Sequence, residues 1–122
     1  MDFMEEKASE EVKGMVSRVA TVFSVLVTTF FIGSQHEEAG DMERVALLVA
    51  SAGLSTHAVR MFGDLDPDTA TTADCYDLLF RVTEQSIPFV MEVENTLSDG
   101  GIHIVTPDGK RPSDLVREAL TA

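Results

Sequence analysis

One cysteine, Cys75, is present among the 122 residues, and a single thiol cannot form a disulfide within the chain. Its isolation excludes the usual framework of a small secreted scaffold and favours a reducing compartment. The start of the sequence also lacks the basic segment of an export signal. Five acids precede the first apolar stretch instead: Asp2, Glu5, Glu6, Glu10 and Glu11. We therefore expect a cytoplasmic protein.

Basic residues are scarce as well, with 9 Lys and Arg against 21 Asp and Glu and a net charge of -12. The excess of acid lies in residues 1–44 and 71–99, whereas residues 100–122 are balanced. A surface of this kind repels the phosphates of nucleic acids and favours solubility or binding to a basic protein. We expect an acidic, solvated surface, and the alternative is a dedicated partner protein with a basic surface.

The motifs of common catalytic sites are absent. The sequence has no glycine-rich phosphate loop and no nucleophile elbow, and His36, His57 and His103 show no metal-ligand spacing. Cys75 follows Asp74, whose negative charge opposes formation of the thiolate. The sequence therefore predicts a non-catalytic protein without a cofactor, in which Cys75 is a small buried side chain.

Three aspartates, Asp64, Asp66 and Asp68, alternate along one loop as the first ligands of a calcium loop do. The pattern then fails, because Thr69 stands where the calcium loop needs glycine and Cys75 stands where it needs glutamate. We predict no metal site, and the three aspartates are weak candidates only. Their simpler role is an acidic cap on the helix that follows.

A long apolar helix is the strongest pattern in the chain. Apolar residues alternate at spacings of four and three, which is the periodicity of a helix from about residue 4 to 32. They are Val12, Val16, Val19, Phe23, Leu26 and Phe30. The second half of this segment is apolar on its other faces too, so it must be buried on every side. We predict that these six residues form the interface of a homo-oligomer. The alternative is the core of a monomer.

The same helix has no charged residue from Val19 to Gly33. Fifteen residues of helix cover about 22 Å, which is shorter than the roughly 30 Å hydrocarbon core of a membrane. We therefore expect a buried helix and no membrane contact. The β-branched residues in this segment would also suit a buried strand, which is the alternative structure.

Capping residues and glycines divide the rest of the chain into shorter predicted helices. These span about 41–51, 56–62, 72–82, 87–99 and 114–120. The caps are Asp41, Ser55, the pair Thr71 and Asp74, Ser86 and Ser113. Between the last two helices, Ile102–Val105 is β-like and predicts a short extended segment. The expected fold is a single all-α domain, 1–122, with five to six helices.

The segment from Val49 to Phe62 carries a glycine turn at Ala52–Ser55 between two predicted short helices. It resembles the helix-turn-helix of bacterial transcription regulators. The resemblance implies that Thr56, His57 and Arg60 face the major groove of DNA. Arg44 and Arg60 are the only basic residues between Asp41 and Asp68, however, so phosphate contacts are few.

Taken together, these patterns predict an acidic protein–protein interaction module, of the adaptor or inhibitor type, that assembles with itself. Two other classes of function stay open. One is a DNA-binding regulator that uses residues 49–62. The other is a small-ligand or divalent-ion binding protein, which would need a pocket where Cys75, His57 and the loop at Asp64 converge.

Overall fold

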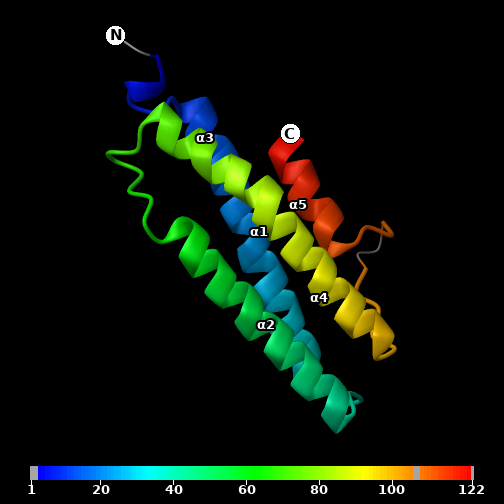
Figure 1. The fold of residues 1–122 in the computed structure, drawn as a ribbon. Helices are drawn as coiled ribbons and strands as arrows, with labels where there is room; N and C mark the ends of the chain where they lie inside the picture. Colours follow the sequence, from blue (N-terminus) through cyan, green and yellow to red (C-terminus); the bar gives the residue numbers. More distant parts are fainter. Residues whose placement is uncertain (1–2, 106–107, 122) are drawn as a thin grey trace.

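The computed structural model describes residues 3–105 and 108–121, and these residues form helices and connecting loops (Figure 1). A 3₁₀ turn at Phe3–Glu5 precedes α1 (Glu10–Ser34), α2 (Asp41–Phe62), α3 (Thr72–Arg81), a π-helical turn (Val82–Ser86), α4 (Ile87–Asp99) and α5 (Pro112–Thr121). Since α3, the π turn and α4 follow one another without a break, the described chain forms four rods. The expectation of an all-α fold is confirmed. The prediction of five to six helices is not.

Helix α1 is the central rod of the bundle. The Ser9 hydroxyl accepts a hydrogen bond from the Val12 N–H at 3.3 Å, and Glu10 and Glu11 occupy the first turn, where negative charge stabilises a helix. The helix therefore begins at Glu10 and not near residue 4. The six apolar residues predicted as an interface lie on this helix, and we call them the α1 seam: Val12, Val16, Val19, Phe23, Leu26 and Phe30. All six are buried within the single chain, under α2, α3 and α5. The seam is core, so a second chain cannot cover it in this conformation.

Helix α2 corrects the prediction of two short helices. It runs unbroken through Gly53 and Ser55, and its buried residues continue at helical spacing across the expected turn: Leu47, Ala50, Leu54 and Met61. A glycine inside a helix costs about 1 kcal/mol, which is less than burying Leu54 against the core contributes. The tertiary contacts therefore override the local break signal. The Ser51 hydroxyl adds a hydrogen bond to the Val27 carbonyl on α1 at 2.9 Å.

Helices α3 and α4 are joined by the π turn instead of being separated by a break. Thr71 and Asp74 form the predicted reciprocal capping box at the start of α3. The buried positions then follow at intervals of four: Leu78, Val82, Ser86 and Val90. On a regular α-helix, each side chain in such a series points about 40° away from the one before it. The wider π turn takes up this drift, so all four side chains stay turned toward the core.

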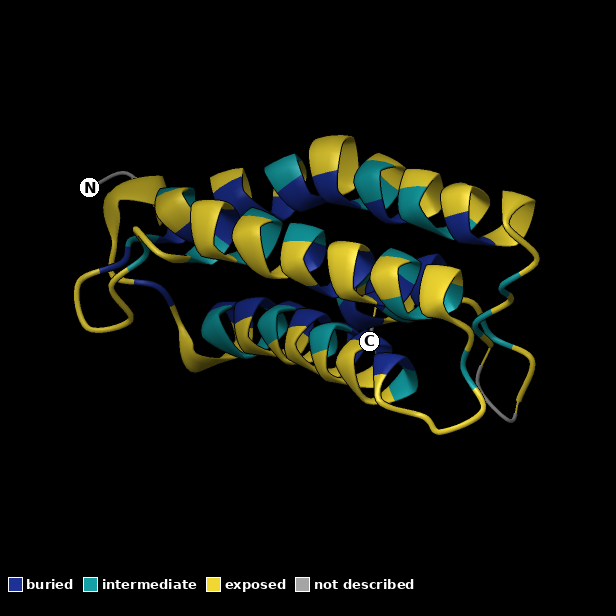
Figure 2. Cartoon of the chain, turned by 90° about the horizontal axis from the view of Figure 1, so that it is seen from below, coloured by how far each residue is buried: buried dark blue, intermediate teal, exposed yellow. Residues whose placement is uncertain are grey.

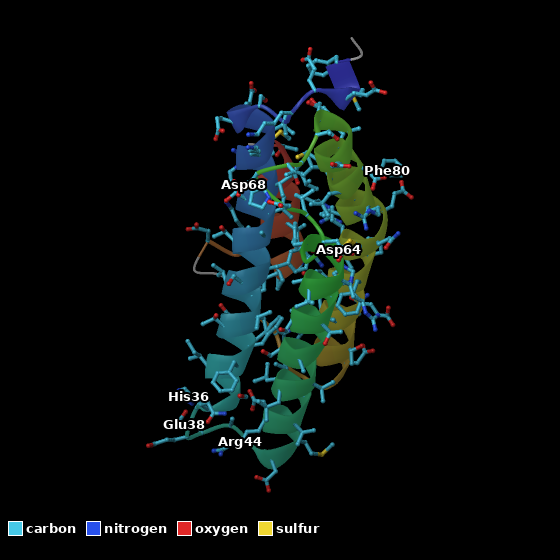
Figure 3. The ribbon with its side chains drawn as sticks, turned by 90° about the vertical axis from the view of Figure 1, so that its left-hand side faces the viewer. His36, Glu38, Arg44, Asp64, Asp68 and Phe80 are labelled. Atoms are coloured by element: carbon cyan, nitrogen blue, oxygen red, sulfur yellow. The ribbon has the colours of Figure 1, made fainter. Side chains whose placement is uncertain are left out.

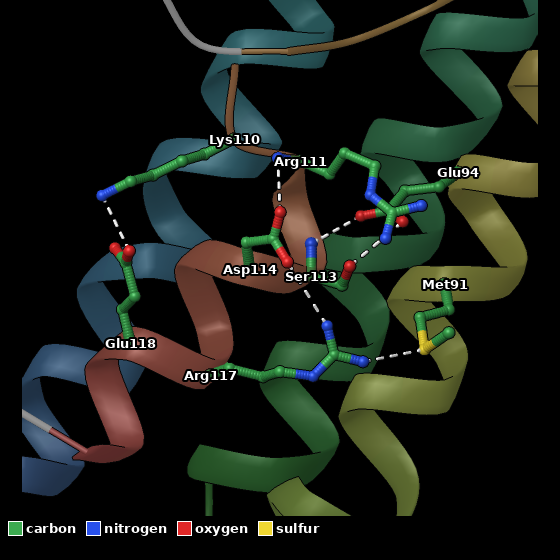
Figure 4. Close-up of polar contacts among 8 residues, drawn as sticks. All are labelled: Met91, Glu94, Lys110, Arg111, Ser113, Asp114, Arg117 and Glu118. Atoms are coloured by element: carbon green, nitrogen blue, oxygen red, sulfur yellow. Dashed lines mark hydrogen bonds and ion pairs between the residues drawn. The ribbon is translucent and has the colours of Figure 1, made fainter. Parts of the chain in front are cut away.

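Helix α5 is held to α4 by a carboxylate. Glu94 accepts hydrogen bonds from the backbone N–H and the hydroxyl of Ser113 at the first turn of α5 (Figure 4). Ser113 is thus a residue inside the helix and not its cap. The chain enters α5 through residues 102–105, which are irregular and form no strand, so the predicted extended segment is not confirmed. Ile102 and Ile104 pack against the core there.

The four rods enclose one core, as the buried stripes that face the interior show (Figure 2). Helix α2 packs along α1, and α5 packs between α1 and α4. The contact between α2 and α4 is sparse. Residues of both helices line a groove between them.

We expect Glu94→Ala to destabilise the fold by about 1–3 kcal/mol, because the Ser113 N–H and hydroxyl lose a charged acceptor in a half-buried place. Urea denaturation followed by circular dichroism measures the change. The control is Glu84→Ala, which removes an exposed carboxylate from the same rod and should change stability by less than about 0.5 kcal/mol. Equal effects of the two substitutions would contradict the anchoring role of Glu94.

Candidate functional site

His57 lies where α2 meets the π turn and α4. Its Nε2 atom is 2.7 Å from the Ser86 hydroxyl oxygen, and its ring stacks on Phe89 with a centroid distance of 4.7 Å and an interplanar angle of 7°. The Phe23 ring of α1 approaches the same imidazole at 5.8 Å. The unbroken course of α2 and the π turn bring these residues together. They form a rigid cluster between three rods.

The surroundings of the imidazole disfavour its charged form. Burial lowers the pKa of His57 from 6.5, and the positive charge of Arg60 lowers it further. The Ser86 side chain is 0% exposed, so no substrate reaches its hydroxyl oxygen. The His57–Ser86 pair therefore fixes α2 to the π turn and does not present a nucleophile.

The groove between α2 and α4 begins beside this cluster. It has a volume of about 450 Å³ and a mostly apolar lining: Ala46, Val49, Ala50, Gly53, Phe89, Glu92, Val93, Thr96 and Leu97. Among the described residues that line it, Glu92 is the only charged one. A shallower extension continues past Gly53 to Thr56, His57 and Arg60. The missing side chain at Gly53 keeps the middle of the groove open, since a Cβ there would lie 3.7 Å from the Phe89 ring.

The outer face of α2 is a second apolar surface. Five residues at spacings of four, three, four and three point away from the core: Val45, Val49, Ala52, Thr56 and Val59. We call them the outer stripe. Val45, Val49 and Val59 are 60%, 65% and 67% exposed. The neighbouring face of α1 adds Phe31, 51% exposed. A solvent-facing side of a helix is normally polar, so this surface is unusual.

By length and composition alone, α1 and α2 are each apolar enough to cross a membrane, and 28% of the apolar window in each is buried inside the fold. The core helices of soluble proteins also meet this criterion, so the observation is weak evidence for a membrane. It does show how much apolar surface these two helices carry beyond what one core uses.

The helix-turn-helix interpretation needs a turn that the structure does not contain. Thr56, His57 and Arg60 lie within the uninterrupted helix α2, and His57 points toward Ser86 rather than outward. A recognition helix must stand clear of the helix before it to enter the major groove. Residues 49–62 therefore do not form that motif.

The other candidate residues do not converge either. Asp66 accepts a hydrogen bond from the Asp68 N–H in the α2–α3 loop, and Asp64 and Asp68 lie apart (Figure 3). In the described part of the chain, no three His, Cys, Asp or Glu residues are placed to hold a metal ion. Cys75 is buried in α3, and burial followed by the charge of Asp74 raises the pKa of its thiol, with Lys13 opposing.

Two features of this site escaped the sequence analysis. The π turn is one, and the contact of His57 with Ser86 and Phe89 is the other. The series of four-residue intervals from Leu78 to Val90 was a usable signal for the π turn. Nothing local indicated that His57 faces Ser86, because the two residues are 29 positions apart.

No protein-family model matches the chain, and neither a curated protein nor a solved structure is significantly similar to it. The function is therefore argued from the surfaces described above.

We expect stability to depend on pH through His57. Its pKa is lower in the folded chain than the unfolded value of 6.5, so the unfolded state takes up the proton first as pH falls. The contribution of His57 is complete above about pH 6.5 and is lost as pH falls from there toward the folded pKa. The free energy of unfolding of the wild type should therefore drop more between pH 7.5 and 5 than that of His57→Gln. Parallel pH profiles would contradict this.

Proposed function

We propose that the protein is a non-catalytic helical interaction module that works as a homodimer, with the outer stripe of α2 at the interface. The observation that carries the proposal is the exposed seam Val45–Val49–Ala52–Thr56–Val59, whose spacing is that of a coiled coil. Exposed apolar surface of this extent marks interaction sites. This stripe replaces the α1 seam as the proposed interface, because the α1 seam is buried in the core of the single chain.

A second copy fits the stripe by its pattern. The stripe is centred on Ala52, and a two-fold axis at this residue makes the surface complementary to itself. Antiparallel pairing then sets Val45 of one copy against Val59 of the other, and β-branched side chains fill both ends of the seam. The small Ala52 side chains at the centre allow the two helices to approach closely.

Charge favours the antiparallel orientation. Asp41 begins α2 and Arg60 stands in its last turn. In an antiparallel pair centred on Ala52, each Arg60 lies level with position 44 of the other copy and about one turn from its Asp41. The Arg44 guanidinium is turned back to the carbonyls of His36, Glu37 and Ala39, so Asp41 is the charge that Arg60 can approach. A parallel pair would place two aspartates together at one end and two arginines at the other. Such like charges oppose each other and disfavour that pairing.

Light scattering on a sizing column, over a series of protein concentrations and without detergent, tests the assembly. We expect a mass of twice 13.3 kDa for the wild type and 13.3 kDa for Val59→Glu, because the new carboxylate would be buried unpaired in the seam. The matched control is Phe80→Glu on α3, at a side chain that is 64% exposed compared with 67% for Val59. It should leave the dimer intact. A wild-type monomer at every concentration would refute the proposal.

Cross-linking tests the orientation. We expect a Val45→Cys variant and a Val59→Cys variant to form a mixed disulfide with each other when combined and oxidised, and neither to link efficiently with itself. The antiparallel pair brings these two positions together across the axis. The native Cys75 is buried, so it should form no disulfide between copies. Efficient self-linking of each variant would show a parallel pair instead.

A further inference from the structure

The groove between α2 and α4 adjoins the outer stripe, since Val49 lines it and Ala52 and Thr56 line its extension, but its α4 side gives it a chemistry of its own. We propose that it is a docking site for an amphipathic helix from a basic partner protein, whose apolar side chains fill the groove while its Lys and Arg residues pair with acids around it. The inference goes beyond the proposed dimer and does not rest on it.

Shape supports a helix as the occupant. The apolar lining runs along α2 from Ala46 to Gly53, and the shallower extension continues past Thr56 and His57 to Arg60. Fourteen residues of helix cover about 21 Å, or about four turns, which is the length over which a helical ligand places anchors at i, i+4, i+7 and i+11. The lining is continuous over this length and lies between two rods that touch only sparsely.

The middle of the groove offers a fixed apolar platform. The Phe89 ring is held against His57, which is held in turn by Ser86. Gly53 faces this ring across the groove with no side chain of its own. An aliphatic anchor of the incoming helix can therefore sit on Phe89 over Gly53. Anchors in preformed pockets of this kind contribute most of the binding energy of an interface.

Charge specifies the partner. Glu92 stands on the lining at mid-length. Asp41 at the start of α2 and Asp99 at the end of α4 lie at the same end of the bundle, because the two helices run in opposite directions (Figure 1). Arg60 lies at the other end. Acidic residues thus lie on the lining and at the neighbouring ends of the two helices that bound the groove, within a chain of net charge -12. Arg44 at this end is bound to the carbonyls of His36, Glu37 and Ala39, so the acids orient a basic helix with its cations toward Asp41 and Asp99.

The test uses two designed 18-residue helical peptides with leucines at spacings of four and three. In one the remaining positions are lysine and alanine, and in the other each lysine is replaced by glutamate. Fluorescence anisotropy of the labelled peptides measures binding to the full chain. We expect the lysine peptide to bind, with an affinity that falls as salt is added, and the glutamate peptide to bind at least ten-fold more weakly.

Variants locate the site. Gly53→Leu fills the centre of the groove and removes a helix-weakening glycine, so it should keep the fold and weaken the lysine peptide more than ten-fold. Glu92→Lys should weaken it about two- to five-fold, as expected for one exposed ion pair. The control Asn95→Leu adds the same side chain to α4 outside the residues that line the groove and should leave binding unchanged. Circular dichroism checks the fold of each variant.

Several outcomes would overturn the proposal, and the last one below separates it from the dimer. Equal binding of both peptides, or binding that Gly53→Leu does not affect, excludes the groove as a site for a basic helix. Loss of the dimer mass in Gly53→Leu would show that a second copy occupies the groove. Binding of the chain to phosphatidylcholine vesicles, abolished by Gly53→Leu, would assign the groove to a lipid surface. Failure of Val59→Glu to change the dimer mass would refute the stripe and leave the groove untouched.

Discussion

The packing of α1 against α2 is the contact on which the other rods depend. Phe23 of α1 is fully buried and touches both His57 and Phe62 of α2. The Leu47 side chain lies against Gly33, where a Cβ would be 3.4 Å from it, and a hydrogen bond from Ser51 joins the two helices between these points. Helices α4 and α5 then cover the inner side of this pair. Both of them are therefore positioned by the shape that α1 and α2 present.

That pair also carries more apolar surface than the core can bury. An amphipathic helix offers one apolar side, and α4 and α5 cover that side of α1 and α2. The outer stripe on α2 and Phe31 on α1 lie on the other side, where the described chain provides no further rod. The free energy that such surface contributes when buried is available only to association. This excess of exposed apolar surface on α1 and α2 is what supports the interaction role proposed above.

Residue patterns predicted the α1 seam and the capping box of Thr71 and Asp74, because both depend on neighbours within a few positions. They failed at Gly53, where the helix-breaking tendency of glycine is outweighed by the burial of Ala50 before it and Leu54 after it. They also failed at Ser86, which was read as a cap although its hydroxyl bonds to His57 across the bundle. Periodicity shows that the α1 seam is a buried face but not which chain buries it, and in the structure the seam is buried within one chain.

The groove and the π turn have a common origin. Pro88 has no backbone N–H to donate to the preceding turn, and a π turn just before it is where a helix accommodates that loss. The added width rotates everything after Ser86, so Phe89 faces α2 at the level of Gly53. A regular helix would turn Phe89 by roughly a further 100° from this position and remove the platform. The orientation of Phe89 in the groove between α2 and α4 is thus set by a specific backbone feature, and the result is an apolar groove with one carboxylate, Glu92, on its lining.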